Sequence, residues 1–143
     1  MNSPASDIAS LIASEGLGTF NGSSGWSIHV SKEPTAPDTC ITVYDTGEYP
    51  SSPQIDQDDP TVQVRIRGAA SGYLAAYLKA QDVKRTVHIF RGAIGSATTY
   101  AGVFHVNGPT HIGEDSLSRP LFTINFRALR SPTNGAYPRQ RGA

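Results

Sequence analysis

Residues 61–80, TVQVRIRGAASGYLAAYLKA, decide the fold, because the apolar period changes within them from two residues to three or four. Apolar and polar side chains alternate over residues 61–67, which predicts a strand with Val62, Val64 and Ile66 on its buried face. Gly68 ends this strand, and a helix is predicted over residues 71–90. Its apolar stripe consists of Tyr73, Ala76, Tyr77, Ala80, Val83, Val87 and Phe90.

The flanking sequence predicts further strands over residues 26–31, 39–45, 98–106 and 119–130, and the last would bury Phe122, Ile124 and Phe126. Asn107-Gly108-Pro109 is expected to interrupt the fourth strand of the chain, which resumes over residues 110–113. At the N-terminus, Ser3 before Pro4 is typical of a helix start.

The order of the elements is helix, three strands, helix, two strands, and strands therefore cluster instead of alternating with helices. This order predicts an α+β fold, with a single mostly antiparallel β-sheet and two helices packed on one face. Residues 1–130 would form one domain, and residues 131–143 have the composition of a flexible C-terminal tail.

Composition excludes several classes of protein. The formal net charge of the 143 residues is +0, so total charge indicates neither nucleic acid nor an anionic membrane as a partner. No apolar stretch approaches the roughly 20 residues of a membrane helix. Cys40 is the only cysteine, so an intrachain disulfide is ruled out. We expect Cys40 to be a half-buried strand residue. We expect a soluble protein made in a reducing cytoplasm.

Charge is segregated along the chain. One acidic segment contains Asp45, Glu48, Asp56, Asp58 and Asp59 and no Lys or Arg, whereas the segment from Arg127 onward contains four arginines and no acid. This pattern suits a subunit that contacts copies of itself, and two solvated surface segments would explain it equally well. The candidate contact residues are these five acids together with Arg65, Arg67, Glu114, Asp115 and Arg119.

No catalytic, cofactor-binding or metal-binding pattern is present. Asp56, Asp58 and Asp59 match a calcium loop only in part, because Pro60 closes the run. His105 and His111 could approach each other across adjoining strands, near Glu114, but histidines on a polar face are the better interpretation. We therefore predict no enzymatic activity and no cofactor.

Two segments carry a resemblance to a known family. THIGEDSLSRPLFTINFRALR, residues 110–130, resembles the C-terminal hairpin of the phage tail terminator or minor capsid protein family. RIRGAASGYLAAYLKA, residues 65–80, is similar to the central strand–Gly–helix passage of that family. WSIHVSKEP and TCITVYDTG also fit its opening, so the resemblance covers roughly residues 5–130.

The resemblance implies a structural virion protein at the junction of tail and neck, assembled in the host cytoplasm. It implies a ring, generally a homohexamer, that caps the tail tube and joins it to the neck or head connector. Its partners would be copies of itself, the major tail tube protein, and a neck or head-completion protein. Genomic DNA would pass through the lumen without sequence recognition, and no membrane is involved. A head-completion or neck protein of the same region, or a small non-viral binding module, remains an alternative.

Overall fold

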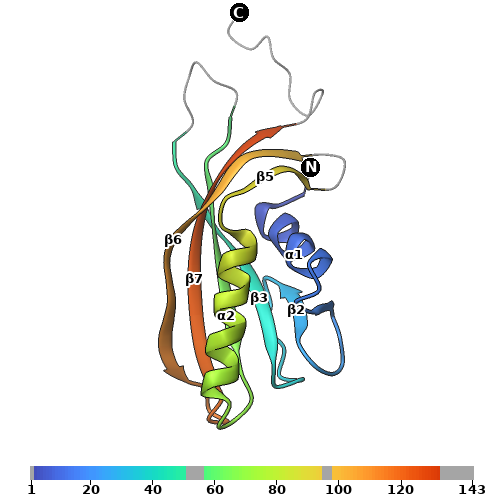
Figure 1. Ribbon diagram of the computed structural model, residues 1–143, viewed down its shortest axis with the longest axis vertical. Helices are drawn as coiled ribbons and strands as arrows, with labels where there is room; N and C mark the ends of the chain where they lie inside the picture. The colour runs from blue at the N-terminus through green and yellow to red at the C-terminus, as the bar shows by residue number, and fades with distance from the viewer. Residues whose placement is uncertain (1, 51–56, 95–97, 133–143) are drawn as a thin grey trace, which may run out of the picture.

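The computed structural model describes residues 2–50, 57–94 and 98–132. Strands account for 48% of these residues. Figure 1 shows the elements, which are α1 (Pro4–Ser14), β1 (Thr19–Phe20), β2 (Ser27–Val30), β3 (Cys40–Glu48), β4 (Pro60–Arg67), α2 (Tyr73–Val87), β5 (Phe90–Ile94), β6 (Thr98–Glu114) and β7 (Pro120–Pro132).

All seven strands belong to one sheet, in the order β1-β2-β3-β4-β7-β6-β5. The β1–β2 and β2–β3 pairs are parallel, and the other four pairs are antiparallel. The sheet is therefore mixed, and it curls into a half-barrel beside the two helices (Figure 1). The predicted α+β arrangement, with a single mostly antiparallel sheet and two helices on one face, is wrong: the chain is mostly β, and its sheet is a mixed sheet that includes two parallel pairs and curls into a half-barrel.

The curl has a local cause in β6. Its pairing with β7 shifts register between Tyr100 and Gly102, between His105 and Thr110, and between His111 and Gly113. Each shift inserts unpaired backbone that bends the strand and increases its twist. The expected break at residues 107–109 is one of these irregularities, so β6 continues through it. Gly108 is required there, because its φ is +94° and a Cβ would collide with the backbone of Thr123.

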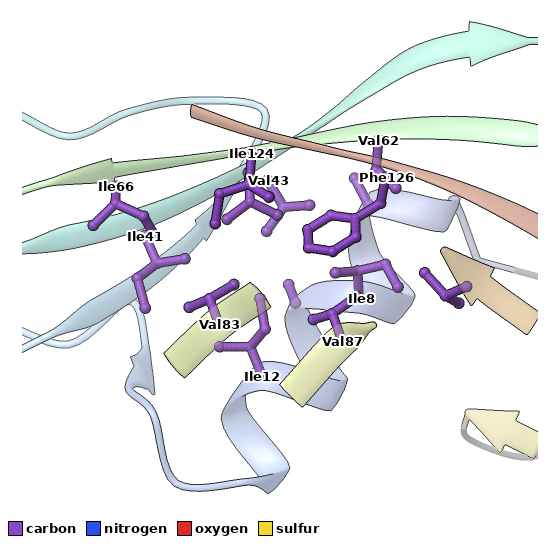
Figure 2. Packing of buried hydrophobic residues seen from close by; sticks show 14 of the residues in the cluster. Ile8, Ile12, Ile41, Val43, Val62, Ile66, Val83, Val87, Ile124 and Phe126 are labelled. Atoms are coloured by element: carbon purple, nitrogen blue, oxygen red, sulfur yellow. The ribbon is translucent and has the colours of Figure 1, made fainter. Parts of the chain in front are cut away.

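The core lies between the two helices and the inner face of the sheet. Figure 2 shows side chains of α1 and α2 pointing toward those of the central strands. The helices contribute Ile8, Ile12, Val83 and Val87, and the strands contribute Ile41, Val43, Val62, Ile66, Ile124 and Phe126. The buried faces predicted for residues 61–67 and 119–130 are thus confirmed, with Tyr77 partly buried against the core.

The helix starts and ends follow local chemistry. Ser3 caps α1 by accepting a hydrogen bond from the backbone N–H of Ser6, with Pro4 as the first helical residue. Helix α2 ends at Val87, three residues earlier than predicted. Ile89 has a φ of +64° and donates its N–H to the Val103 carbonyl at 2.7 Å, so the chain turns directly into β5.

Candidate functional site

The acidic and basic segments pair with each other inside one chain. Arg127 donates from Nε and Nη2 to the two carboxylate oxygens of Asp59 at 2.8 and 2.6 Å. Arg130 donates from Nη2 to Asp58 at 3.0 Å, and their backbones form two hydrogen bonds of 2.8 and 2.9 Å. In the described residues, both arginines of the basic segment therefore pair with acids of the same subunit near the end of β7.

Arg130 also adjoins a buried polar pair. The Tyr100 hydroxyl on β6 donates to the Asp7 carboxylate on α1 at 2.7 Å, and Asp7, Tyr100 and Arg130 are all buried. Burial raises the pKa of Tyr100, and the hydrogen bond to Asp7 raises it further, so the phenol stays a donor. This pair attaches the N-terminal helix to the long strand β6.

Asp45 accepts a hydrogen bond from the same helix, α1. The backbone N–H of Ala5, in the first turn of α1, donates to Asp45 Oδ1 at 2.9 Å. A carboxylate at a helix N-terminus satisfies a free N–H and interacts favourably with the helix dipole. Asp45 therefore has an intrachain role as a cap for α1.

Arg67 projects from the outer face of β4 but is covered there by its own chain. Its guanidinium is buried, with 2% of the residue exposed. It donates to the carbonyls of Pro34, Pro37 and Asp38 at 2.6, 2.8 and 2.9 Å. The connection of residues 31–39, between β2 and β3, thus lies over the outer face of the sheet, and that face is covered where we expected solvent.

Arg65 is partly exposed and also pairs within the chain, with Glu33 at 3.3 Å. Glu33 lies 3.7 Å from Arg67 as well. Both arginines therefore project from the outer face of β4, as the alternation indicates, but only Arg65 is partly exposed there. The sequence pattern missed Glu33 because it belongs to a connection without periodicity.

Arg119 and Asp115 close the turn between β6 and β7. Arg119 is buried, donates from Nε to Asp115 Oδ2 at 2.8 Å, and donates from Nη1 to Thr35 O and Asp38 Oδ1 at 2.7 and 3.0 Å. Partial burial opposes ionisation of Asp115, but its hydrogen bonds with Arg119 and the backbone outweigh this and lower its pKa to about 2. The turn is therefore held as a rigid unit against the 31–39 connection.

The remaining candidate acids differ in position. Glu48 and Glu114 are exposed near the ends of β3 and β6, and neither forms an ion pair with another residue that the structure describes. Asp56 lies outside the described residues.

The histidines do not form a metal site in the described part of the chain. His105 and His111 lie on the same strand, β6, and not on adjoining strands. His105 Nε2 hydrogen-bonds the Gly108 carbonyl at 2.6 Å, while His111 packs against Tyr73 and Phe122. Among the described residues, no group of three His, Cys, Asp or Glu could hold a metal ion.

The model of a protein family described as bacteriophage tail terminator protein matches residues 11–131. The chain belongs to the bacteriophage tail terminator family. This confirms the resemblance stated for residues 65–80 and 110–130, and it makes the chain a structural protein of the phage tail. A search of curated proteins finds no match. No helix in the described ranges of this tail terminator is long and apolar enough to cross a membrane.

Five of the seven arginines in the described residues pair within the subunit, and the exposed surface of the chain also carries large apolar side chains. Leu74 and Leu78 stand one helical turn apart on the outer side of α2 and are 65% and 52% exposed. A second apolar area is a hollow of 390 Å³ on the outer face of β6 and β7, lined by Phe104, His105, Val106, Arg127 and Leu129.

Sequence patterns could have signalled part of this surface. Leu74 and Leu78 lie at helical spacing beside the predicted apolar stripe, whose first member, Tyr73, is itself 52% exposed. Nothing in the sequence indicated the hollow, because it depends on the register between β6 and β7.

Proposed function

We propose that this tail terminator forms a closed ring, six-fold in symmetry, that caps the tail tube and joins it to the neck or head connector. The observation that carries the proposal is the family match over residues 11–131. The exposed apolar surface supports it, because exposed clusters of large apolar side chains mark interaction sites. The ring would bind the last ring of the tube protein on one side and a neck or head-completion protein on the other.

The protein acts in this proposal without catalysis or cofactor. Genomic DNA would pass through the lumen without sequence recognition. Pairing of Arg65 with Glu33 and of Arg127 with Asp59 supports this, since paired guanidiniums bind DNA phosphates less strongly than free ones.

The test is tube growth in the presence of the purified protein. Tube protein of the same phage should polymerise to indefinite length alone, and substoichiometric addition of this protein should stop growth with label at one tube end only. Virions lacking the protein should contain overlong or unjoined tails. Label on the head portal with no effect on tube growth would instead indicate a head-completion protein.

A further inference from the structure

Two apolar surfaces of the chain lie on opposite sides of the β6–β7 pair. Helix α2 packs against the inner face of these strands, as Figure 1 shows, and its outer side carries the exposed Leu74 and Leu78. The hollow lies on the outer face, because its Arg127 alternates with the core residue Phe126 along β7. One side of the molecule thus presents an apolar projection, and the other an apolar depression.

The projection is a stripe of three exposed residues one turn apart, Leu74, Leu78 and Asp82, which we call the α2 stripe. Side chains at this spacing lie above one another on a helix. Leu78 and Leu74 are too exposed to stabilise the fold much by burial. Asp82 forms no ion pair with any residue in the described ranges.

The depression is formed where the aromatic ring of Phe104 lies over Gly102. Phe104 covers Gly102, where a Cβ would collide with the Phe104 ring, and Phe104 pairs directly with Arg127 across the strands. Val106 and Leu129 complete the apolar lining. We call these residues the β6–β7 hollow.

Asp82 on the α2 stripe and Arg127 at the hollow carry opposite charges, while Arg85 is exposed three residues beyond Asp82 and Arg127 is already paired with Asp59. Arg127 uses Nε and Nη2 for Asp59, its side chain is 46% exposed, and neither of these bonds uses Nη1. The Tyr49 ring covers one face of the guanidinium, with its centroid 4.5 Å from Arg127 Cζ, so a second carboxylate would bind at the Nη1 edge. On the α2 stripe, Asp82 stands one turn beyond Leu78, so leucines in the hollow would bring Asp82 to its rim.

We infer that the α2 stripe of one copy binds the β6–β7 hollow of the next copy. The inference rests on the proposed ring and identifies the surfaces that close it. Because stripe and hollow lie on opposite sides of the subunit, every copy uses one of each in a head-to-tail contact, and such contacts generate rings when the rotation closes. Leu74 and Leu78 enter the hollow, and Asp82 lies at its rim; the hollow is lined by Phe104, His105, Val106, Arg127 and Leu129.

Cross-linking between copies tests the pairing directly. The variant carrying Leu78→Cys and Leu129→Cys should give, with a short bis-maleimide, a ladder of covalent oligomers that ends at the ring size. Each single variant should give no ladder, and the buried native Cys40 should not react. The matched control is Leu117→Cys with Leu129→Cys, because Leu117 is an equally exposed leucine in the β6–β7 turn. The control should give no ladder.

A substitution series tests the energetics on the full chain. Leu78→Lys should weaken self-association at least tenfold in sedimentation, whereas Leu117→Lys should leave it unchanged, with identical circular dichroism for both. Rings that assemble but give no Leu78–Leu129 ladder would overturn this interface while leaving the proposed ring intact. Intact Leu78→Lys rings that no longer cap tubes would assign the stripe to the tube protein and also overturn it. A protein that stays monomeric even on tube ends would overturn the ring itself.

Discussion

Arginine is the residue type whose role changes most between sequence and structure. Arg67, Arg119 and Arg130 are all buried, and each is compensated by carbonyls or carboxylates of its own chain. A buried guanidinium needs several acceptors at once, and its planar donors match them. Alternation alone placed Arg67 on the open face, and only the fold shows that a loop covers it. Most of the candidate contact residues thus form hydrogen bonds or ion pairs within the subunit.

Phe126 provides a residue-scale test of the core. It is fully buried between the sheet and α2, whereas its neighbour Asn125 faces outward and is bonded to Gln63 and Asn107. We predict that Phe126→Ala lowers the free energy of unfolding by roughly 3–5 kcal/mol, since it removes apolar contacts and leaves a cavity. Asn125→Ala should cost clearly less. Urea unfolding measures both, and a loss below about 1 kcal/mol for Phe126→Ala would contradict the assigned face.

Tyr100 provides a second test, on the buried pair with Asp7. Tyr100→Phe removes only the hydroxyl that donates to Asp7, and we predict a loss of about 1–3 kcal/mol because a buried acceptor then lacks its donor. In an Asp7→Asn background the same change should cost less. Equal costs in the two backgrounds, measured by a double-mutant cycle, would show that the two groups are not coupled.

At the scale of elements, the 31–39 connection depends on Arg67. Lysine carries one nitrogen and cannot reach three carbonyls in a plane as the guanidinium does. We predict that Arg67→Lys loosens the connection and speeds tryptic cleavage after the exposed Lys32 several-fold. Arg65→Lys is the control, since it keeps the charge beside Glu33 and contacts no carbonyl of the connection in the described structure. Unchanged cleavage in Arg67→Lys would mean that the connection is held by other contacts.

The turn between β6 and β7 should respond to acid. The pKa of Asp115 in the folded protein is about 2, below the roughly 3.9 of an unfolded aspartate. The stabilisation by its carboxylate is therefore complete above about pH 4 and is lost as the pH falls toward 2. We predict that Asp115→Asn lowers the urea midpoint at neutral pH and that the difference from the natural protein shrinks between these pH values. A difference independent of pH would show that ionisation of Asp115 does not stabilise the turn.

The elements that the sequence predicted are those with a clear local period. The alternation of residues 61–67 and the helical stripe after Gly68 led to β4 and α2, because their side chains face a single core. Strand β5 was missed, since Arg91 and Gly92 break any alternation and the helical stripe seemed to include Phe90. Strand β1 has only two residues, which is too short for a period. Local pattern thus predicts an element only where burial repeats along it.

The architecture of the whole molecule could not be predicted from local sequence patterns. Alternation does not say whether a strand pairs parallel or antiparallel, and the parallel β2–β3 pair is set by the 31–39 connection crossing the outer face. The curl depends on bulges in β6, of which the sequence showed only the Asn107-Gly108-Pro109 signal. Family membership, by contrast, was reachable, because the segments 65–80 and 110–130 were long enough to be characteristic.

Salt provides a whole-molecule test of how copies associate. Charged loops were the first candidates for the contact, but Asp58 and Asp59 are bound by Arg130 and Arg127 of the same chain. If the α2 stripe and the β6–β7 hollow form the contact, its one exposed ion pair contributes about 0–1 kcal/mol, so screening should weaken association by no more than about fivefold. Sedimentation in about 0.1 M and about 1 M NaCl, where the Debye length falls from ~10 to ~3 Å, measures this change. A loss of a hundredfold or more would show that charged contacts dominate and would return the acidic segment to the interface. If burial of Leu74 and Leu78 drives the contact, we expect association to persist at high salt, because burial of apolar surface is not weakened by screening.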